Sequence, residues 1–183
     1  FRSPLGHAEI VFENVRVPLD NVLLGEGRGF EIAQGRLGPG RMHHCMRLIG
    51  AGQRALELAC KRVLNRQTFG RPLAKHQSVR EEIAKSFSEI EMARLLVHRT
   101  AQSMDEKGAQ ESRDLIAATK TQVPIMIQTV IDRCMQMHGA GGLTEDYPMA
   151  EHYNYARWCR QADGPDQVHL MTLGKMVIKR YGM

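Results

Sequence analysis

The sequence predicts a mainly α-helical fold, an up-and-down bundle of long helices preceded by a short strand. Three stretches, 41–65, 79–104 and 112–135, repeat apolar residues every three to four positions, which is the spacing that gives a helix one buried face. Short segments rich in glycine or proline separate these stretches. Short connections between long helices are typical of bundles, so we expect the three helices to pack side by side.

The composition suits a globular protein with one main domain. The chain has 183 residues, of which 43% are hydrophobic and 25% are charged, and it holds no apolar run of the length needed to cross a bilayer. The formal net charge is +5, but the basic residues are interleaved with acidic ones and form no block. This pattern favours an anionic small ligand, and we expect neither a nucleic-acid partner nor a membrane.

The cysteines are typical of a reducing compartment, because the chain has neither a Cys-x-x-Cys pair nor a secretory segment. They are Cys45, Cys60, Cys134 and Cys159. We therefore expect an intracellular protein, in the cytoplasm of a bacterium or in the mitochondrial matrix of a eukaryote.

The first predicted element is a strand at residues 8–17, where Ile10 and Phe12 alternate with glutamates before a turn at Asp20-Asn21. No earlier element is available to pair with it, and the sequence begins at Phe1 rather than at a methionine. We expect the chain to be the C-terminal part of a longer protein, with residues 1–28 as the end of a β-domain and a linker. Residues 29–183 are then the helical domain.

Glycines and prolines set the expected ends of the helices. The glycines at 25–29 lack the strand-then-helix context of a phosphate loop and indicate a connector. A helical pattern begins at Phe30, Gly38-Pro39-Gly40 interrupts it, and the first long helix follows from Arg41 to about Asn65. The remaining helices are expected at 79–107, at 112–135 with a kink at Pro124, at 150–159, and from the Asp163 junction to about Tyr181.

Asp163 lies between the last two helical patterns, in Ala162-Asp163-Gly164-Pro165-Asp166-Gln167. Two interpretations are open. Aspartate, glycine and proline cluster at helix N-termini for backbone reasons, and the local sequence by itself favours a helix cap. Alternatively, the junction presents one carboxylate at the mouth of the bundle, where it can act as a base.

Other chemistries have little support in the sequence. His43, His44 and Cys45 are consecutive, so on a helix they point in different directions and do not form a zinc site together. No Gly-x-Ser-x-Gly motif is present, so the sequence does not support a hydrolase. The 11 methionines indicate adaptable core packing.

Three segments together resemble the C-terminal helical domain of the acyl-CoA dehydrogenases. Arg66 to Gln77 is similar to the family's Arg-x-x-Phe-Gly-x-x-Leu-x-x-x-Gln signature, and Gln136 to Leu143 is similar to its glycine-rich segment. The third segment is the Asp163 junction, and Gly-Glu-Gly-Arg-Gly-Phe at 25–30 is similar to the family's link from the middle β-domain into the helices. Taken singly, these segments also suit simple helix termination.

Two further motifs resemble one subfamily, the acyl-CoA dehydrogenase family members ten and eleven and their bacterial relatives. They are Ala-Asp-Gly-Pro-Asp-x-Val-His at 162–169 and the segment Gln34 to Arg47. Members of the family are flavoenzymes of fatty acid metabolism that introduce a double bond between the α and β carbons of an acyl-CoA thioester. The resemblance implies the same fold and reaction here.

The resemblance also implies which residues bind flavin adenine dinucleotide (FAD). Arg66, Thr68 and Phe69 match the family's flavin contacts. Gln136 and Gly139 match residues that reach the dinucleotide of a neighbouring subunit, whereas Ala140 replaces a usual glycine. A cofactor bound across subunits implies a homodimer or homotetramer.

The family's base motif, Glu-Gly-Thr-x-Gln, stands here as Asp163-Gly164-Pro165-Asp166-Gln167. The resemblance therefore implies Asp163 as the base that removes the α-proton, while the β-hydride passes to flavin N5. It places Gln167 near the flavin, and Arg41 and Gly164 near the substrate. Some relatives keep the base just before the arginine that matches Arg41, and that position is Gly40 in this chain. A base in an apolar pocket is chemically reasonable, because loss of hydration strengthens it.

The resulting hypothesis is an FAD-dependent oxidoreductase that dehydrogenates acyl-CoA and passes electrons to electron-transfer flavoprotein. Two alternatives stay open. Loss of the glutamate and threonine of the base motif favours an inactive helical assembly module of the same fold, and an acyl-CoA oxidase would reoxidise the flavin with oxygen. Because family enzymes build the acyl pocket from three domains, we expect the chain alone neither to hold flavin tightly nor to turn over.

Overall fold

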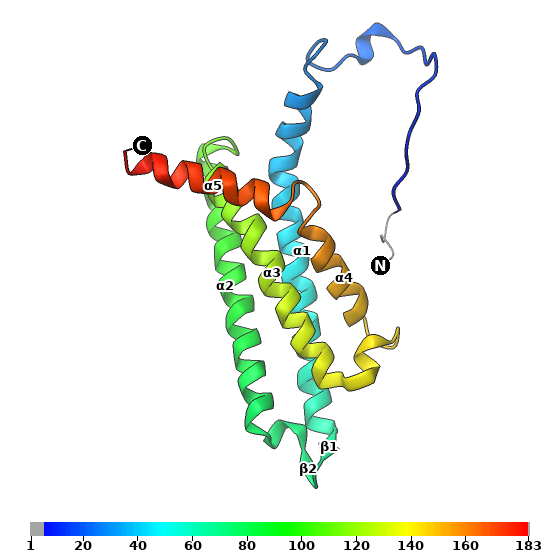
Figure 1. Ribbon diagram of the computed structural model, residues 1–183, viewed down its shortest axis with the longest axis vertical. Helices are drawn as coiled ribbons and strands as arrows, with labels where there is room; N and C mark the ends of the chain where they lie inside the picture. Colours follow the sequence, from blue (N-terminus) through cyan, green and yellow to red (C-terminus); the bar gives the residue numbers. More distant parts are fainter. Residues whose placement is uncertain (1–5, 183) are drawn as a thin grey trace.

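The computed structural model describes residues 6–182, and three long antiparallel helices dominate it (Figure 1). These helices are α1 (Gly29–Asn65), α2 (Gln77–Lys107) and α3 (Arg113–His138). The shorter α4 (Met149–Cys159) returns along α1 and α3, and α5 (Asp166–Arg180) crosses the upper end of α3 in the view of Figure 1. The predicted fold class, a bundle of long helices, is confirmed.

Short elements connect the helices. The two-residue strands β1 (Gln67–Thr68) and β2 (Arg71–Pro72) pair antiparallel in a hairpin at the lower end of the bundle (Figure 1). The 3-10 helix η2 (Leu73–Lys75) leads from this hairpin into α2, and η3 (Gly139–Leu143) follows α3. A further 3-10 turn, η1 (Leu19–Asn21), lies in the N-terminal arm.

The core gathers around α3, which contacts each of the other four helices. Its inward positions are fully buried and recur with helical spacing, and they are Val123, Ile127, Val130, Ile131 and Cys134. On α1, Gly52 faces this row, and a Cβ atom built there would lie 3.0 Å from Ile127 Cδ1. The glycine therefore lets α1 approach α3 closely.

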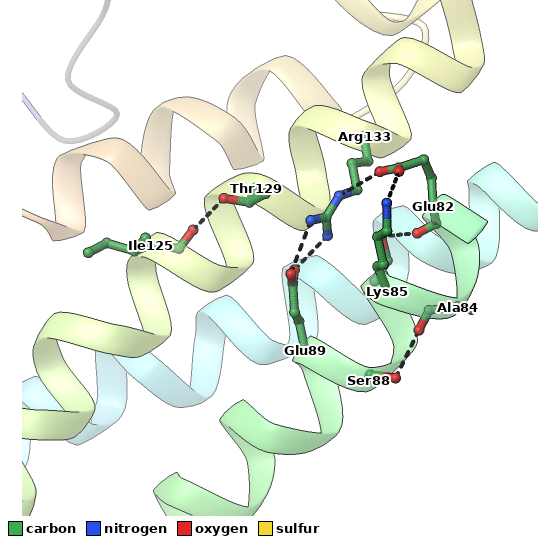
Figure 2. Close-up of polar contacts among 9 residues, drawn as sticks. Glu82, Ala84, Lys85, Ser88, Glu89, Ile125, Thr129 and Arg133 are labelled. Atoms are coloured by element: carbon green, nitrogen blue, oxygen red, sulfur yellow. Dashed lines mark hydrogen bonds and ion pairs between the residues drawn. The ribbon is translucent and has the colours of Figure 1, made fainter. Parts of the chain in front are cut away.

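A network of charged side chains joins α2 to α3 outside this core (Figure 2). The Arg133 guanidinium donates from Nη1 to Glu89 at 2.6 Å and from Nε to Glu82 at 2.8 Å. Lys85 also donates to Glu82, at 2.6 Å. Because both glutamates sit on one face of α2, the network fixes the register of the two helices.

Two predictions about the N-terminal part are wrong. Residues 8–17 are exposed and form no strand in the structure, because a strand requires a hydrogen-bonded neighbour and no other segment of residues 6–182 pairs with them. Proline also does not interrupt the first helix, which begins at Gly29 and continues through Pro39. Pro39 and Gly35 are both exposed, so water can bond the Gly35 carbonyl that Pro39 leaves without an N–H partner.

The other predicted helices are confirmed to within a few residues at their ends. The third helix continues through Pro124, and α4 and α5 flank the Asp163 junction as expected. Among residues 6–182, no helix combines the length and apolarity that crossing a membrane requires.

Candidate active site

The junction between α4 and α5 has an unusual backbone at Asp163. This residue has a φ of 56° and Gly164 has a φ of 106°, so two consecutive residues lie in the left-handed region. Aspartate tolerates this conformation better than most residues, and glycine adopts it freely. A side chain at position 164 is also excluded by space, because a Cβ there would lie 2.8 Å from His169 Nε2. The Asp163-Gly164 pair thus turns the chain sharply into α5.

Two side chains hold the backbone carbonyl of Asp163. Arg41 Nε, from α1, donates to it at 3.0 Å, and His169 Nε2, from α5, donates at 3.2 Å. Burial lowers the pKa of His169, and the nearby Arg41 lowers it further, so the ring is neutral at pH 7. Arg41 is half-buried within α1, so it is not an exposed arginine at a helix start. The carbonyl is thereby tied to both helices.

The carboxylate of Asp163 points toward α1. Its Oδ2 atom is buried and has no hydrogen-bond partner among the described residues. The nearest side-chain nitrogen is His44 Nε2, at 3.4 Å. A Cβ at position 40 would lie 3.3 Å from Oδ2, so the absence of a side chain at Gly40 leaves room for the carboxylate.

The helix-cap interpretation of Asp163 is wrong. The N-cap of α5 is Pro165, and no side-chain hydrogen bond to that cap occurs in the described part of the chain. The acidic residue in the first turn is Asp166, which is buried and accepts a hydrogen bond from Arg160 Nε at 2.8 Å. Asp166 therefore serves the helix start, where a negative charge is favourable, and Asp163 is free for another role.

A buried lysine also lies near the junction. Lys120, on α3, is fully buried, and its Nζ donates to the carbonyl of Cys159 at the end of α4. Burial lowers the pKa of Lys120, whereas the thiols of Cys45 and Cys159 and the two junction aspartates raise it. Lys120 therefore fixes the last turn of α4, directly before Asp163.

A cavity of about 480 Å³ opens beside the junction. It lies between the first turns of α1, the start of α3 and α5, and Arg41 and His169 form part of its wall. Its other polar lining residues are Gln34, Gln110, Arg113 and Thr172. Two arginines and several neutral hydrogen-bonding groups suit an anionic ligand.

All but one of the predicted flavin residues lie far from Asp163. Arg66 and Phe69 are exposed at the hairpin, where Phe69 is 98% exposed, and Thr68 Oγ1 lies 3.3 Å from His76 Nε2. Gln136 and Gly139 are exposed near the end of α3, also toward the lower end of the bundle (Figure 1).

The length of α1 sets this separation. Arg66 follows Arg41 by 25 positions, which is about 37 Å along a helix. Of the predicted flavin contacts, only Gln167 lies near Asp163, two residues into α5, where it is exposed. The structure thus brings Arg41, Asp163 and Gly164 together and places the hairpin residues at the opposite end.

A sequence model of a known domain decides the family. The model of the acyl-CoA dehydrogenase C-terminal domain matches residues 27–178. This chain belongs to the acyl-CoA dehydrogenase family. The predicted resemblance is therefore confirmed, and the match covers all five helices of the bundle except the last two residues of α5.

Individual relatives agree with this assignment. The chain is 54% identical over 176 residues to acyl-CoA dehydrogenase family member 10 of Mus musculus, covering 96% of the chain and 16% of that protein. It is 50% identical over 175 residues to the probable acyl-CoA dehydrogenase FadE2 of Mycobacterium tuberculosis, covering 96% of the chain and 43% of that protein. The chain therefore spans less than half the length of either relative.

A solved structure of the family has the same fold. It is a putative acyl-CoA dehydrogenase from Mycobacterium abscessus, which superimposes with a TM-score of 0.88 at 46% identity. The superposition covers 93% of this chain and 42% of the other.

Sequence reasoning missed His44, Tyr155 and His169 as neighbours of the Asp163 junction. A signal for His44 was available, because it follows Gly40 by four positions and Arg41 by three, which puts all three on one helix face. No comparable local signal marks Tyr155, which is 111 positions from His44. Among residues 6–182, no three His, Cys, Asp or Glu side chains gather in a group able to hold a metal ion.

Proposed function

We propose that this chain is the C-terminal helical domain of an FAD-dependent acyl-CoA dehydrogenase, in which Asp163 removes the α-proton of the acyl-CoA thioester. The proposal rests chiefly on the Asp163 carboxylate. Its loop is anchored by Arg41 and His169, whereas neither carboxylate oxygen accepts a hydrogen bond from the described residues. A general base needs such a combination of a fixed position and an uncommitted carboxylate.

The surroundings of Asp163 support the remaining roles. The backbone N–H of Asp163 donates to no backbone carbonyl within residues 6–182, so it is available to the thioester oxygen, on which negative charge develops. The cavity beside Arg41 and Arg113 suits the anionic part of the CoA thioester. Gly164 leaves the space between the junction and His169 free, because any side chain at position 164 would collide with His169.

The hairpin end of the bundle suits a dinucleotide. The exposed Arg66 guanidinium and the Thr68 hydroxyl are donors for phosphate oxygens, and the exposed Phe69 ring offers an aromatic surface. We propose that these residues hold FAD together with Gln136 and Gly139, and that Gln167 contacts it near Asp163. Bound FAD would supply the acceptor for the β-hydride.

The separation of the two ends supports a homo-oligomer. Arg41, which binds the Asp163 carbonyl, and Arg66 at the hairpin are about 37 Å apart along the helix direction, a separation that favours different copies of the chain as the source of the residues around one cofactor. We therefore propose a homodimer or homotetramer in which the hairpin of one copy completes the flavin site of another. Electron-transfer flavoprotein is the proposed electron acceptor of the complete enzyme.

The test uses the full-length flavoprotein with Asp163→Asn. The variant should keep its yellow bound flavin, whereas the rate of bleaching by acyl-CoA should fall at least about 100-fold, the lower range for loss of a general base. Asp166→Asn is the matched control, because Asp166 supports the helix start and should not affect bleaching beyond its effect on stability.

Three results would lead to other conclusions. Unchanged bleaching in Asp163→Asn would remove Asp163 from the mechanism. A wild-type protein that binds no flavin even with excess cofactor would indicate the inactive module. Peroxide formed during turnover in air would indicate an oxidase.

A further inference from the structure

His44 is positioned by two aromatic residues of α4. Its side chain is 15% exposed and projects from α1 toward the junction, with Nε2 facing Asp163 Oδ2. The Trp158 ring meets the imidazole edge-on, with centroids 5.3 Å apart, and Tyr155 stacks on Trp158 at 5.7 Å. This packing leaves the imidazole little freedom to rotate away from the carboxylate.

Tyr155 also determines which ring nitrogen carries the proton. The Tyr155 hydroxyl lies 2.9 Å from His44 Nδ1. Burial raises the pKa of Tyr155, so the hydroxyl keeps its proton. Nε2 faces a carboxylate oxygen, which only accepts hydrogen bonds, so the neutral imidazole carries its hydrogen on Nε2 and accepts the hydroxyl proton of Tyr155 at Nδ1.

Burial and the cations around His44 favour this neutral form. Burial is the largest cause and lowers the pKa of His44, while Asp163 raises it. Arg36 and Arg47 on α1 and Lys120 on α3 lower it further. Together with the Tyr155 hydroxyl of α4, these groups set the electrostatic environment of the ring.

The two oxygens of Asp163 are in different environments. Oδ2 is buried against His44 and Gly40, whereas 18% of the side chain as a whole remains exposed. The open side of the carboxylate is therefore the side of Oδ1. If His44 Nε2 and Asp163 Oδ2 move slightly closer than the present 3.4 Å, an Nε2–H···Oδ2 hydrogen bond forms.

We propose, given the function inferred above, that His44 is the positioning residue for the base. Its Nε2–H, set by Tyr155, holds Oδ2 of Asp163 and leaves Oδ1 to accept the α-proton of the substrate. The hydrogen bond fixes the short aspartate side chain in one rotamer and stabilises its ionised form before proton transfer. His44 acts through Asp163 and does not itself contact the reacting carbon.

The experiment measures single-turnover flavin bleaching by acyl-CoA in the full-length flavoprotein, at several pH values and substrate concentrations. In His44→Ala, the rate at saturating substrate should fall about 10- to 100-fold, as expected for loss of a hydrogen bond to a charged group. The substrate concentration at half-maximal rate should change much less. The acidic limb of the pH–rate profile should move to higher pH, because the carboxylate loses its donor.

Matched variants separate positioning from a purely structural effect. His44→Gln keeps an N–H donor of similar reach and should recover most of the lost rate. Tyr155→Phe removes the hydroxyl that bonds His44 Nδ1, so the imidazole hydrogen can occupy either ring nitrogen. This variant should reduce the rate several-fold, with the same change in pH profile as His44→Ala. His43→Gln alters the adjacent, exposed histidine and should behave as wild type.

The outcomes distinguish this inference from the proposed function. If the wild-type flavoprotein is not bleached by acyl-CoA, both fail together. If wild type and His43→Gln bleach normally and His44→Ala keeps the wild-type rate and pH profile, only the role of His44 is refuted. If His44→Ala does not fold, Tyr155→Phe decides, and an unchanged rate and pH profile in that variant overturns the proposal.

Discussion

Replacing two glycines of α1 by alanine should have opposite effects on stability. Gly50 and Gly52 lie two positions apart in the same helix. Gly50 is exposed, and a Cβ there meets no atom within 4 Å. At Gly52 a Cβ would lie 3.0 Å from Cδ1 and 3.2 Å from Cγ2 of Ile127, on α3. The two substitutions are therefore identical in chemistry and differ in packing.

The expected magnitudes follow from two opposing terms. Alanine is about 1 kcal/mol more favourable than glycine inside a helix, and this gain applies to both sites. Carbon atoms prefer separations of about 3.5–4.0 Å, so Gly52→Ala overpacks the α1–α3 contact. Overpacking a core costs about 1–3 kcal/mol. Gly50→Ala should thus stabilise the fold by about 0.5–1 kcal/mol, whereas Gly52→Ala should destabilise it by up to about 2 kcal/mol.

Urea unfolding of the chain, followed by circular dichroism at 222 nm, measures both effects. The midpoint should rise for Gly50→Ala and fall for Gly52→Ala, with a similar slope in both. Ile127→Val removes the Cδ1 atom of the closest contact, so its own cost should be smaller in the Gly52→Ala background than in the wild type. Equal stabilisation by both alanines would refute the close α1–α3 approach at Gly52.

Two further predictions concern titrating groups. Three histidines have a pKa that burial lowers below the unfolded value of 6.5: His44, His152 and His169. Because the unfolded chain then binds more protons than the folded chain in acid, the free energy of unfolding should fall as the pH decreases from about 7 to 5. Equal urea midpoints at pH 7.5 and 5.5 would contradict this. Burial raises the pKa of all four thiols, to about 12 in Cys45 and Cys134 and to about 11 in Cys159, but only Cys60 is half-buried and the other three are buried. A thiol reagent at pH 8 should therefore modify Cys60 first and the other three only after urea is added, and rapid reaction of all four in the native chain would contradict the buried positions.

The helices were largely predictable because their signals are local. Apolar residues spaced three to four positions apart predicted α2 and α3 nearly to their ends, and Lys107-Gly108 predicted where α2 ends. The failures involve distant or solvent effects. Residues 8–17 have a strand pattern without a partner strand, and water access at Gly35 allows Pro39 within α1.

The site was predictable only in part. Resemblance to the family indicated Asp163 as the base, whereas the local sequence pattern favoured Asp163 as a helix cap. The φ of 56° at Asp163 and the N-cap at Pro165 rule out the cap role. His44 was considered only together with its sequence neighbours. Its actual partners, Tyr155 and Asp163, come from α4 and from the junction.

The sequence by itself determined the helical periods, the helix ends at glycine and proline, and the motifs of the acyl-CoA dehydrogenase family, because each of these depends only on residues close together in the sequence. Only the tertiary structure decided what surrounds the Asp163 carboxylate. Arg41 reaches the Asp163 carbonyl across 122 positions, and the empty space at Gly40 accommodates Oδ2. Such contacts depend on how α1, α4 and α5 pack, and packing is set by the sum of many buried contacts rather than by any short segment.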